Sequence, residues 1–346
     1  MGAALVLRQH ILALIFGRVE ADVMENALVY FLLTATAYPF MGIYNAGAAL
    51  FRAMGNSKVS MINSFIINVI NILVNAILIF GFGMGAAGAG IGTLVSRIAA
   101  AVIIMVMLRH PGLTVQVDDI FHFEFNGSMI RRILFIGIPT GMENGMFQAG
   151  KLMVLNLITT FGTSAVAANA IANSISGVIN VPGSAMGLAI ITVIGRCIGA
   201  GDTRQAVHYT KLLVGCSYLS MLIMGSALFF SADFLVTLFN LSPEAMAMAS
   251  QVLKLCAIAN MLFWPMAFTL PNSLRAAGDA VFTMGVSLCS MFACRVALSY
   301  VMACEWGLGL GLLGVWLAMI ADWVARAVLF FVRYRQGKWK KIKVIG

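Results

Sequence analysis

The stretch Ala49-Leu50-Phe51-Arg52-Ala53-Met54-Gly55-Asn56 decides the fold, because it occurs twice in the chain. It recurs, loosely, as Asn272-Ser273-Leu274-Arg275-Ala276-Ala277-Gly278-Asp279. An offset of 223 residues relates the two copies from Phe16 and Phe239 to Met61 and Met284, and it becomes 226 at Gly83 and Gly309. A duplicated sequence usually folds as a duplicated lobe, so we expect two pseudo-symmetric helical bundles with the function between them.

The first copy is shorter than the second at its start. Few residues precede Phe16, whereas the second copy extends back from the equivalent Phe239 to the neighbourhood of Met129. We therefore expect the first lobe to be incomplete by about 95 residues, enough for two or more membrane helices. The apolar stretch 5–16 is interpreted as the end of a third helix.

The composition requires a lipid environment. Of the 346 residues, 61% are hydrophobic and only 10% are charged. A soluble domain cannot bury that much apolar surface, so the sequence predicts an all-α polytopic membrane protein. Nine apolar runs come near or exceed the ~20 residues that a spanning helix needs. These runs are 24–50, 58–82, 86–108, 133–160, 164–190, 211–230, 245–270, 281–303 and 311–332.

The basic residues indicate the orientation in the membrane. Six of them stand near the end of the chain without an acidic neighbour: Arg333, Arg335, Lys338, Lys340, Lys341 and Lys343. Cytoplasmic segments are rich in Lys and Arg, so we expect a multi-pass protein of the plasma or inner membrane with a cytoplasmic C-terminus. Alternating crossings then place Arg275 in an inside loop. This distribution explains the net charge of +9 without a nucleic-acid partner.

One polar stretch, Arg109 to Phe125, is typical of a linker between lobes. The predicted organisation has three parts. An incomplete N-terminal lobe occupies 1–109 with the end of helix 3 and helices 4–6, and a cytoplasmic linker occupies 110–128. A C-terminal lobe occupies 129–346 with helices 7–12 and the basic tail. Six spans in this lobe imply twelve in a complete protein, with the lobes related by an axis along the membrane normal.

Neither the glycine patterns nor the cysteines indicate a cofactor. Gly83-Met84-Gly85-Ala86-Ala87-Gly88 and Gly309-Leu310-Gly311-Leu312-Leu313-Gly314 fit G-x-G-x-x-G. A dinucleotide site requires a preceding strand, and here a helix precedes each pattern, so tight turns and close helix packing explain them better. The six cysteines show no CxxC pairing and the four histidines are scattered, so we expect neither a metal nor an organic cofactor.

Together these features resemble the multidrug and toxic compound extrusion (MATE) family. The resemblance rests on the repeated Leu/Phe-Arg-Ala-x-Gly-Asn/Asp pattern, on Gly199-Ala200-Gly201-Asp202, and on Ile136-Gly137-Ile138-Pro139 followed by Glu143. It covers nearly all of the chain. It implies a two-lobed antiporter that exports cationic or amphipathic small molecules, such as drugs and toxins, in exchange for H+ or Na+ by alternating access. We expect this transporter to act as a monomer.

Glu143 is the main candidate for coupling transport to an ion. A charged group at the bilayer centre costs roughly 2.5–3.5 kcal/mol on insertion scales, so such residues are functional candidates. Glu143 follows Pro139, which removes a backbone donor and can open the helix locally. The resembling family has a coupling carboxylate on this helix, and Glu143 matches it. A structural ion pair with Lys151 or Arg295 is the alternative interpretation.

Other polar residues within the spans extend the candidate site for substrate and coupling ion. They are Asn144, Gln148, Lys151, Asn173 and Asn180. The asparagines either line a wet cavity or form hydrogen bonds between helices. The resembling family also has an aspartate in the span 245–270. This chain has no acid there, which favours proton over sodium because a hard cation needs several oxygen ligands.

Three charged residues are candidates for structural or gating ion pairs. Asp322 and Arg326 are four residues apart, so they can pair on one helical face. Arg295 is alone on its span, and Asp322 or Glu143 is its expected partner.

Two alternatives to drug export stay open. A lipid-linked oligosaccharide flippase of the same broad superfamily would need a cleft rich in Arg and Lys to hold pyrophosphate. A chain that lacks part of its first lobe could instead be a transporter fragment without activity. A membrane enzyme is not indicated, because the sequence shows no clustered catalytic set.

Overall fold

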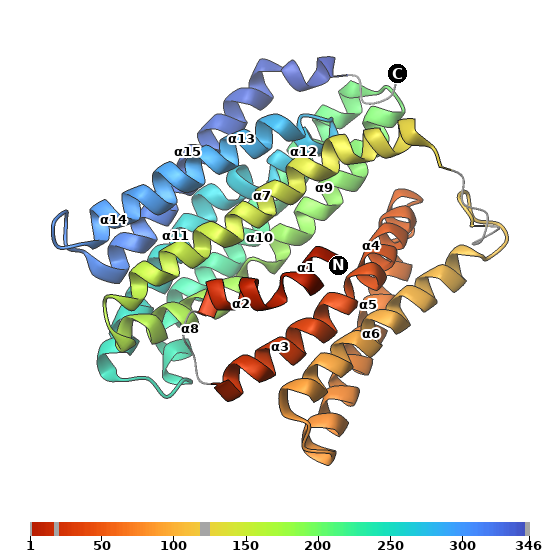
Figure 1. The fold of residues 1–346 in the computed structure, drawn as a ribbon. Helices are drawn as coiled ribbons and strands as arrows, with labels where there is room; N and C mark the ends of the chain where they lie inside the picture. The colour runs from red at the N-terminus through yellow and green to blue at the C-terminus, as the bar shows by residue number, and fades with distance from the viewer. Residues whose placement is uncertain (1, 17–20, 118–124, 343–346) are drawn as a thin grey trace. The chain divides into compact units, whose positions relative to one another are not determined.

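The computed structural model describes residues 2–16, 21–117 and 125–342, and within these ranges it contains helices and no strand. This confirms the predicted all-α class. The chain divides into two compact units, Met1–Phe125 and Asn126–Gly346 (Figure 1). The predicted linker 110–128 crosses this boundary, and its residues 118–124 lie outside the described part of the chain.

The N-terminal unit is built around its last helix, α6. Its elements are α1 (Gly2–Val6), α2 (Arg8–Phe16), α3 (Ala21–Thr36), α4 (Tyr38–Ala53), α5 (Ser57–Ala76), the π-helical η1 (Ile77–Gly81) and α6 (Gly85–Leu108). Helix α6 packs against α3, α4 and α5. Buried glycines permit this close approach, since a Cβ atom on Gly90 would lie 2.7 Å from Leu33.

The C-terminal unit contains more helices. Its first elements are α7 (Gly127–Thr159), α8 (Thr163–Ile179), α9 (Val181–Gly199), α10 (Thr203–Thr237), α11 (Pro243–Trp264) and the π-helical η2 (Pro265–Thr269). They are followed by α12 (Pro271–Ala276), α13 (Ala280–Ser290), the π-helical η3 (Met291–Ala297), α14 (Leu298–Ala303), α15 (Gly311–Gln336) and the short 3-10 helix η4 (Lys338–Lys341). Small and apolar side chains of α8, α11 and α15 share one core. The long α7 runs along this unit and contacts α13, η3 and α15 (Figure 1).

The number of membrane spans differs from the prediction. Seven helices of the described part are long and apolar enough to cross a membrane, or eight if the bent pair α3 and α4 is one span. The predicted nine included 133–160, which corresponds to most of α7 (Gly127–Thr159), and α7 is not among the seven. The predicted span 164–190 is divided at Asn180 between α8 and α9. Pro182 stands in the first turn of α9, where its missing N–H is tolerated.

The repeated sequence produces repeated backbone geometry. Gly55 and Gly278 adopt φ values of 86° and 88°, in the left-handed region that favours glycine. In both turns the next residue donates its N–H, at 2.9 Å, to the carbonyl five residues earlier. Both turns therefore end their helix in the same way, which is the local structure expected from a duplicated unit.

The two G-x-G-x-x-G patterns are also equivalent turns between helices. Gly83 and Gly309 have φ values of 65° and 64°, and their patterns open α6 and α15. The last glycine of each pattern packs closely, since a Cβ atom on Gly314 would lie 2.6 Å from the carbonyl oxygen of Met302. A helix precedes both turns, so the structure agrees with the packing interpretation and not with a dinucleotide site.

This close contact gives a stability prediction. Gly314→Ala is expected to lower the free energy of unfolding by about 1–3 kcal/mol, because the new methyl group meets backbone atoms that cannot rotate away. Gly285→Ala in α13 is the matched control, since a methyl group added there would have no other atom within 4 Å. Thermal unfolding of the detergent-solubilised protein should show a lower midpoint for Gly314→Ala only. Equal midpoints for the two variants would contradict the close packing of α14 on α15.

Candidate functional site

Glu143 lies midway along α7, the helix that Asn126 caps by accepting a hydrogen bond from the Met129 N–H at 3.1 Å. The helix continues through Pro139, one turn before Glu143. The side chain of Glu143 is buried, with an exposed fraction of 8%. A buried carboxylate in a membrane helix requires partners to offset its desolvation.

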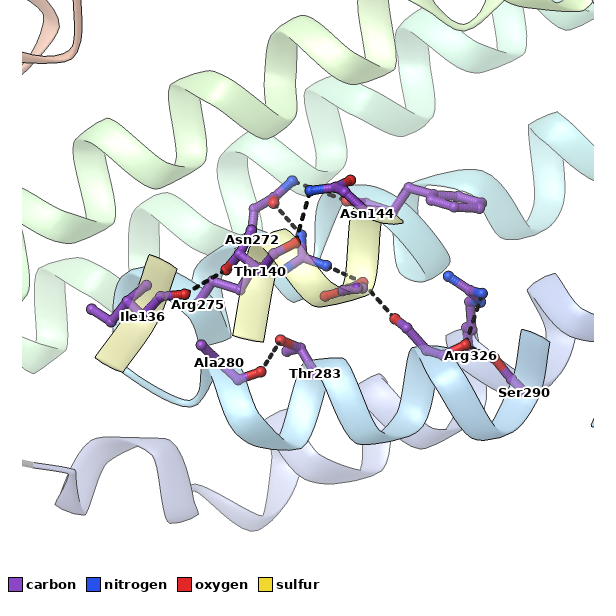
Figure 2. Close-up of polar contacts among 12 residues, drawn as sticks. Ile136, Thr140, Asn144, Asn272, Arg275, Ala280, Thr283, Ser290 and Arg326 are labelled. Atoms are coloured by element: carbon purple, nitrogen blue, oxygen red, sulfur yellow. Dashed lines mark hydrogen bonds and ion pairs between the residues drawn. The ribbon is translucent and has the colours of Figure 1, made fainter. Parts of the chain in front are cut away.

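The partners of Glu143 come from two other helices. Its Oε1 atom accepts hydrogen bonds from Arg275 Nη2 and from Ser287 Oγ, each at 2.6 Å. Its Oε2 atom is buried and has no hydrogen-bond partner in the described structure. Figure 2 shows the groups around this carboxylate, with Thr140 and Asn144 labelled on α7 and Arg275 beside them. One carboxylate oxygen of Glu143 therefore accepts two hydrogen bonds, one of them within an ion pair, while the other has no partner in the described structure.

Arg275 does not lie in the inside loop that the sequence predicted for it. It lies in α12, it is about one-fifth exposed, and its Nη1 atom donates to Asn272 Oδ1 at 2.8 Å (Figure 2). The predicted ion pair of Glu143 with Lys151 or Arg295 is therefore wrong. The helix α12 begins at Pro271 and directly follows η2, so the chain stays helical to Arg275 where the apolar run ends. The signal was present in the sequence, because Arg275 is the arginine of the repeated motif.

The network continues from Ser287 to α15. The carbonyl oxygen of Ser287 accepts a hydrogen bond from Arg326 Nη2 at 3.1 Å, and Arg326 Nε pairs with Asp322 Oδ1 at 2.8 Å. Asp322 and Arg326 are almost fully buried, with exposed fractions of 0% and 3%. The predicted pair along one face of the last helix is thus present. Polar groups of α7, α12, α13 and α15 therefore form one connected cluster, in which the backbone carbonyl of Ser287 joins α13 to α15.

Arg295 lies in η3 outside this cluster. It was expected to pair with Asp322 or Glu143, but within the described residues it forms neither ion pair. Its Nη2 atom instead lies 3.1 Å from Met319 Sδ, and its guanidinium stands 5.1 Å from the centre of the Phe147 ring. The π-helical turn from Met291 to Ala297 shifts Arg295 relative to a regular helix, a placement that sequence spacing does not reveal.

Phe147 gathers cations around its ring. Lys151 Nζ and the Arg295 guanidinium each lie 5.1 Å from the ring centre, and the Arg326 guanidinium lies 5.5 Å from it. Cations are attracted to an aromatic face by its quadrupole, with about 0.5–2 kcal/mol per contact depending on solvation. One aromatic ring thus brings together three positive charges, of which only that of Arg326 has a carboxylate partner in the described structure.

Two neighbouring cavities lie within the C-terminal unit. The first measures about 550 Å³ and includes Gln148 and Asn169 in its wall, and the second measures about 390 Å³ and includes Phe147 and Asn180. Both cavities share five lining residues: Lys151, Asn173, Arg295, Trp316 and Met319. Volumes of this size suit small-molecule ligands.

The predicted polar residues distribute unequally over these cavities. Gln148, Lys151, Asn173 and Asn180 line one or both of them, whereas Asn144 lines neither and donates to the Thr140 carbonyl at 2.9 Å.

The asparagines of α8 combine both interpretations that the sequence left open. Asn173 donates to Asn169 Oδ1 at 3.0 Å, and the same oxygen accepts from Trp316 Nε1 at 3.2 Å. Asn173 thus lines the cavities while Asn169 makes the hydrogen bond between helices.

The fold and the site define a class of protein. Several apolar helices span a membrane, and one helical unit encloses a buried charged cluster beside ligand-sized cavities. The sequence model of the MatE family matches residues 1–77 and 139–301, which is more than half of the chain. The chain therefore belongs to the MatE family.

Individual relatives agree with this assignment. The chain is 26% identical to the probable multidrug resistance protein NorM of Thermotoga maritima, over 99% of this chain and 74% of that protein. It is 28% identical to the uncharacterized transporter YisQ of Bacillus subtilis, over 84% of this chain and 64% of that protein. A solved structure described as the outward-facing conformation of a multidrug resistance MATE family transporter has the same fold. Its TM-score is 0.87 at 19% identity, over 99% of this chain and 77% of that one.

Proposed function

We propose that this protein is a secondary active efflux transporter that exports small amphipathic molecules by alternating access, in exchange for protons. It would act in the cell membrane with its C-terminus in the cytoplasm. The observation that carries this proposal is the buried carboxylate of Glu143, which shares one oxygen with Arg275 and Ser287 and leaves the other unoccupied. The names of the relatives, which include a multidrug resistance protein and a transporter, support export of small molecules.

The geometry suggests how proton binding is linked to movement. A protonated Glu143 would lose its charge, so its ion pair with Arg275 and its protonation exclude one another. Arg275 is carried by the short helix α12, which the π-helical η2 connects to α11. Separation of α12 from α7 is therefore thermodynamically linked to the protonation of Glu143, as any conformational change is linked to the ion that prefers one of its states.

The same contacts favour a proton over a sodium ion. A sodium site needs several oxygen ligands around the ion, and positive groups next to it are unfavourable. Glu143 offers one free oxygen next to a guanidinium, and the span from Pro243 to Ala276 contributes no carboxylate beyond Glu244 at its start. A proton requires only the free oxygen.

The coupling ion is tested in proteoliposomes that contain the pH dye pyranine. The compounds added are ethidium and 2-naphthoate. We expect a compound that the protein transports to produce a proton flux that does not require sodium. Empty liposomes measure passive leakage. A flux that appears only with a sodium gradient would contradict proton coupling, and transport of neither probe would contradict efflux by this chain.

The flippase alternative has less support in the structure. A pyrophosphate group needs several unpaired cations, and two candidates are already paired within the C-terminal unit. Lys254 Nζ lies 2.7 Å from Asp233 Oδ2, and Arg326 is paired with Asp322. Lys151 and Arg295 are left at the cavities, which is enough for a single acidic group.

A further inference from the structure

The two cavities of the C-terminal unit carry charge of one sign. Their only charged lining residues among those described are Lys151 and Arg295, and both are shared by the two cavities. The nearby carboxylates of Glu143 and Asp322 are already engaged by Arg275 and Arg326. The charge of Asp322 also acts on Arg295, but Asp322 is already paired with Arg326, and no carboxylate lines either cavity, so the walls carry a net positive charge.

Arg295 is the more deeply buried of the two cations. Its side chain is buried, with an exposed fraction of 7%, and the hydrogen bond described for its guanidinium is to the thioether of Met319 at 3.1 Å. A guanidinium has five N–H donors, and a thioether sulfur is a weak acceptor. A buried charge with such partners is costly unless an anion joins it.

The neutral polar groups of the second cavity also favour an acceptor-rich ligand. The indole N–H groups of Trp264 and Trp323 are buried and have no hydrogen-bond partner in the described part of the structure. Asn180 has an unpartnered amide oxygen, but its amide also carries two donors. Among the buried atoms of this wall that have no partner in the described structure, two are donors and one is an acceptor.

The same cavity has an aromatic wall. The rings of Trp264 and Phe268 are stacked at 4.2 Å, and Trp323 meets both edge-on at 5.4 Å and 5.8 Å. Flat apolar groups stack well on such surfaces. An aromatic body of a ligand and an acidic group can therefore be accommodated within one site.

We propose that these cavities bind an amphipathic anion, with its carboxylate, sulfonate or phosphate on Lys151 and Arg295 and its aromatic part near Trp264 and Trp316. This proposal rests on the proposed export function, because it names the class of compound exported. The family resemblance implied cationic or amphipathic substrates, and the charge of this site selects the anionic members of the amphipathic class. The ligand is a free small molecule and not a lipid headgroup, because the aromatic walls match a compact body.

The test compares two ligands of the same shape and opposite charge. The purified protein in detergent is titrated with 2-naphthoate and with 2-naphthylmethylammonium, and quenching of tryptophan fluorescence reports binding. We expect 2-naphthoate to bind at least about 10-fold more tightly, which corresponds to about 1.4 kcal/mol. Equal binding, or tighter binding of the ammonium compound, would overturn the proposal. Tighter binding of dihexanoyl phosphatidate than of 2-naphthoate would overturn the choice of a free small molecule.

Variants then locate the anion. Lys151→Gln and Arg295→Gln should each weaken 2-naphthoate binding about 5- to 20-fold, and Arg295→Lys should retain part of the affinity. Lys211→Gln in α10 removes the same charge from a side chain that lines neither cavity, so it should have no effect. Lys151 is exposed, so its variant is expected to fold. Unchanged affinity in Lys151→Gln would refute the placement.

The outcome is separable from that of the export function. Binding in detergent involves no gradient, so a preference for 2-naphthoate without any proton-linked transport would remove the export function and leave the anion site standing. Proton-linked transport of ethidium without binding of 2-naphthoate would remove the anion site and leave the export function standing.

Discussion

Glu143→Gln is expected to abolish proton-driven export while the protein remains in the membrane. Glutamine has nearly the same shape as glutamate, but it cannot be protonated and it does not form an ion pair with Arg275, which now lies 2.6 Å from the carboxylate. Transport driven by a pH gradient should fall by at least about 10-fold, as expected when an interaction worth about 1.4 kcal/mol or more is lost. Substrate exchange without a gradient should be retained, because the cavity residues are unchanged.

The comparison between driven transport and exchange separates coupling from simple structural damage. Glu244→Gln is the matched control, since Glu244 is exposed at the start of α11 and contacts Ser164 outside the cluster. Ser287→Ala removes the second hydrogen bond to Glu143 Oε1 without changing a charge, so it should reduce driven transport only in part. Driven export that is unaffected in Glu143→Gln would exclude this residue from coupling.

The sequence predicted the fold well where the signal repeats along the chain. The hydrophobic runs predict the helical class, and the duplicated motif predicts two turns that the structure shows with the same backbone geometry at Gly55 and Gly278. The interruptions were harder to predict. The π-helical segments η1 and η3 lie inside apolar runs, where no local pattern marks an extra residue per turn, whereas η2 begins at Pro265. The division between α8 and α9 lies beside Pro182, within a run that was predicted as one span.

Part of the candidate site could also be predicted from the sequence. Polar residues within apolar runs stand out, so Glu143, Asp322 and Arg326 were found from the sequence alone. Arg275 was missed because it ends an apolar run, and a basic residue at that position is typical of a cytoplasmic loop. Its pairing with Glu143 spans 132 positions along the chain, and no sequence spacing reveals such a contact.

The charge of the cavities could not be predicted either. Arg326 and Arg295 were both expected to have a carboxylate partner, as buried charges usually do. The structure pairs Arg275 and Arg326 with carboxylates and leaves Lys151 and Arg295 near the ring of Phe147. The difference between a neutral site and a cationic one thus depends on which acid meets which base, and only the three-dimensional structure decides this.

Asp322→Asn is expected to cause the largest loss of stability of any single change in the cluster. Asp322 is fully buried and pairs with Arg326 at 2.8 Å, so its loss leaves a buried guanidinium without a carboxylate. Removing one partner of a buried ion pair costs about 3–5 kcal/mol. The midpoint of thermal unfolding of the detergent-solubilised protein should therefore fall strongly.

The double variant Asp322→Asn/Arg326→Met distinguishes a structural pair from a transport site. It removes both charges and fills the volume with an apolar side chain, so it should recover much of the lost stability, as replacement of a whole buried pair often does. Lys254→Gln breaks the exposed pair with Asp233 and should leave the midpoint unchanged. Because Arg326 also donates to the Ser287 carbonyl beside Glu143, the double variant should transport more weakly than the native protein even where its stability recovers. A native midpoint for Asp322→Asn together with abolished transport would show instead that Asp322 acts in transport and not as a structural clamp.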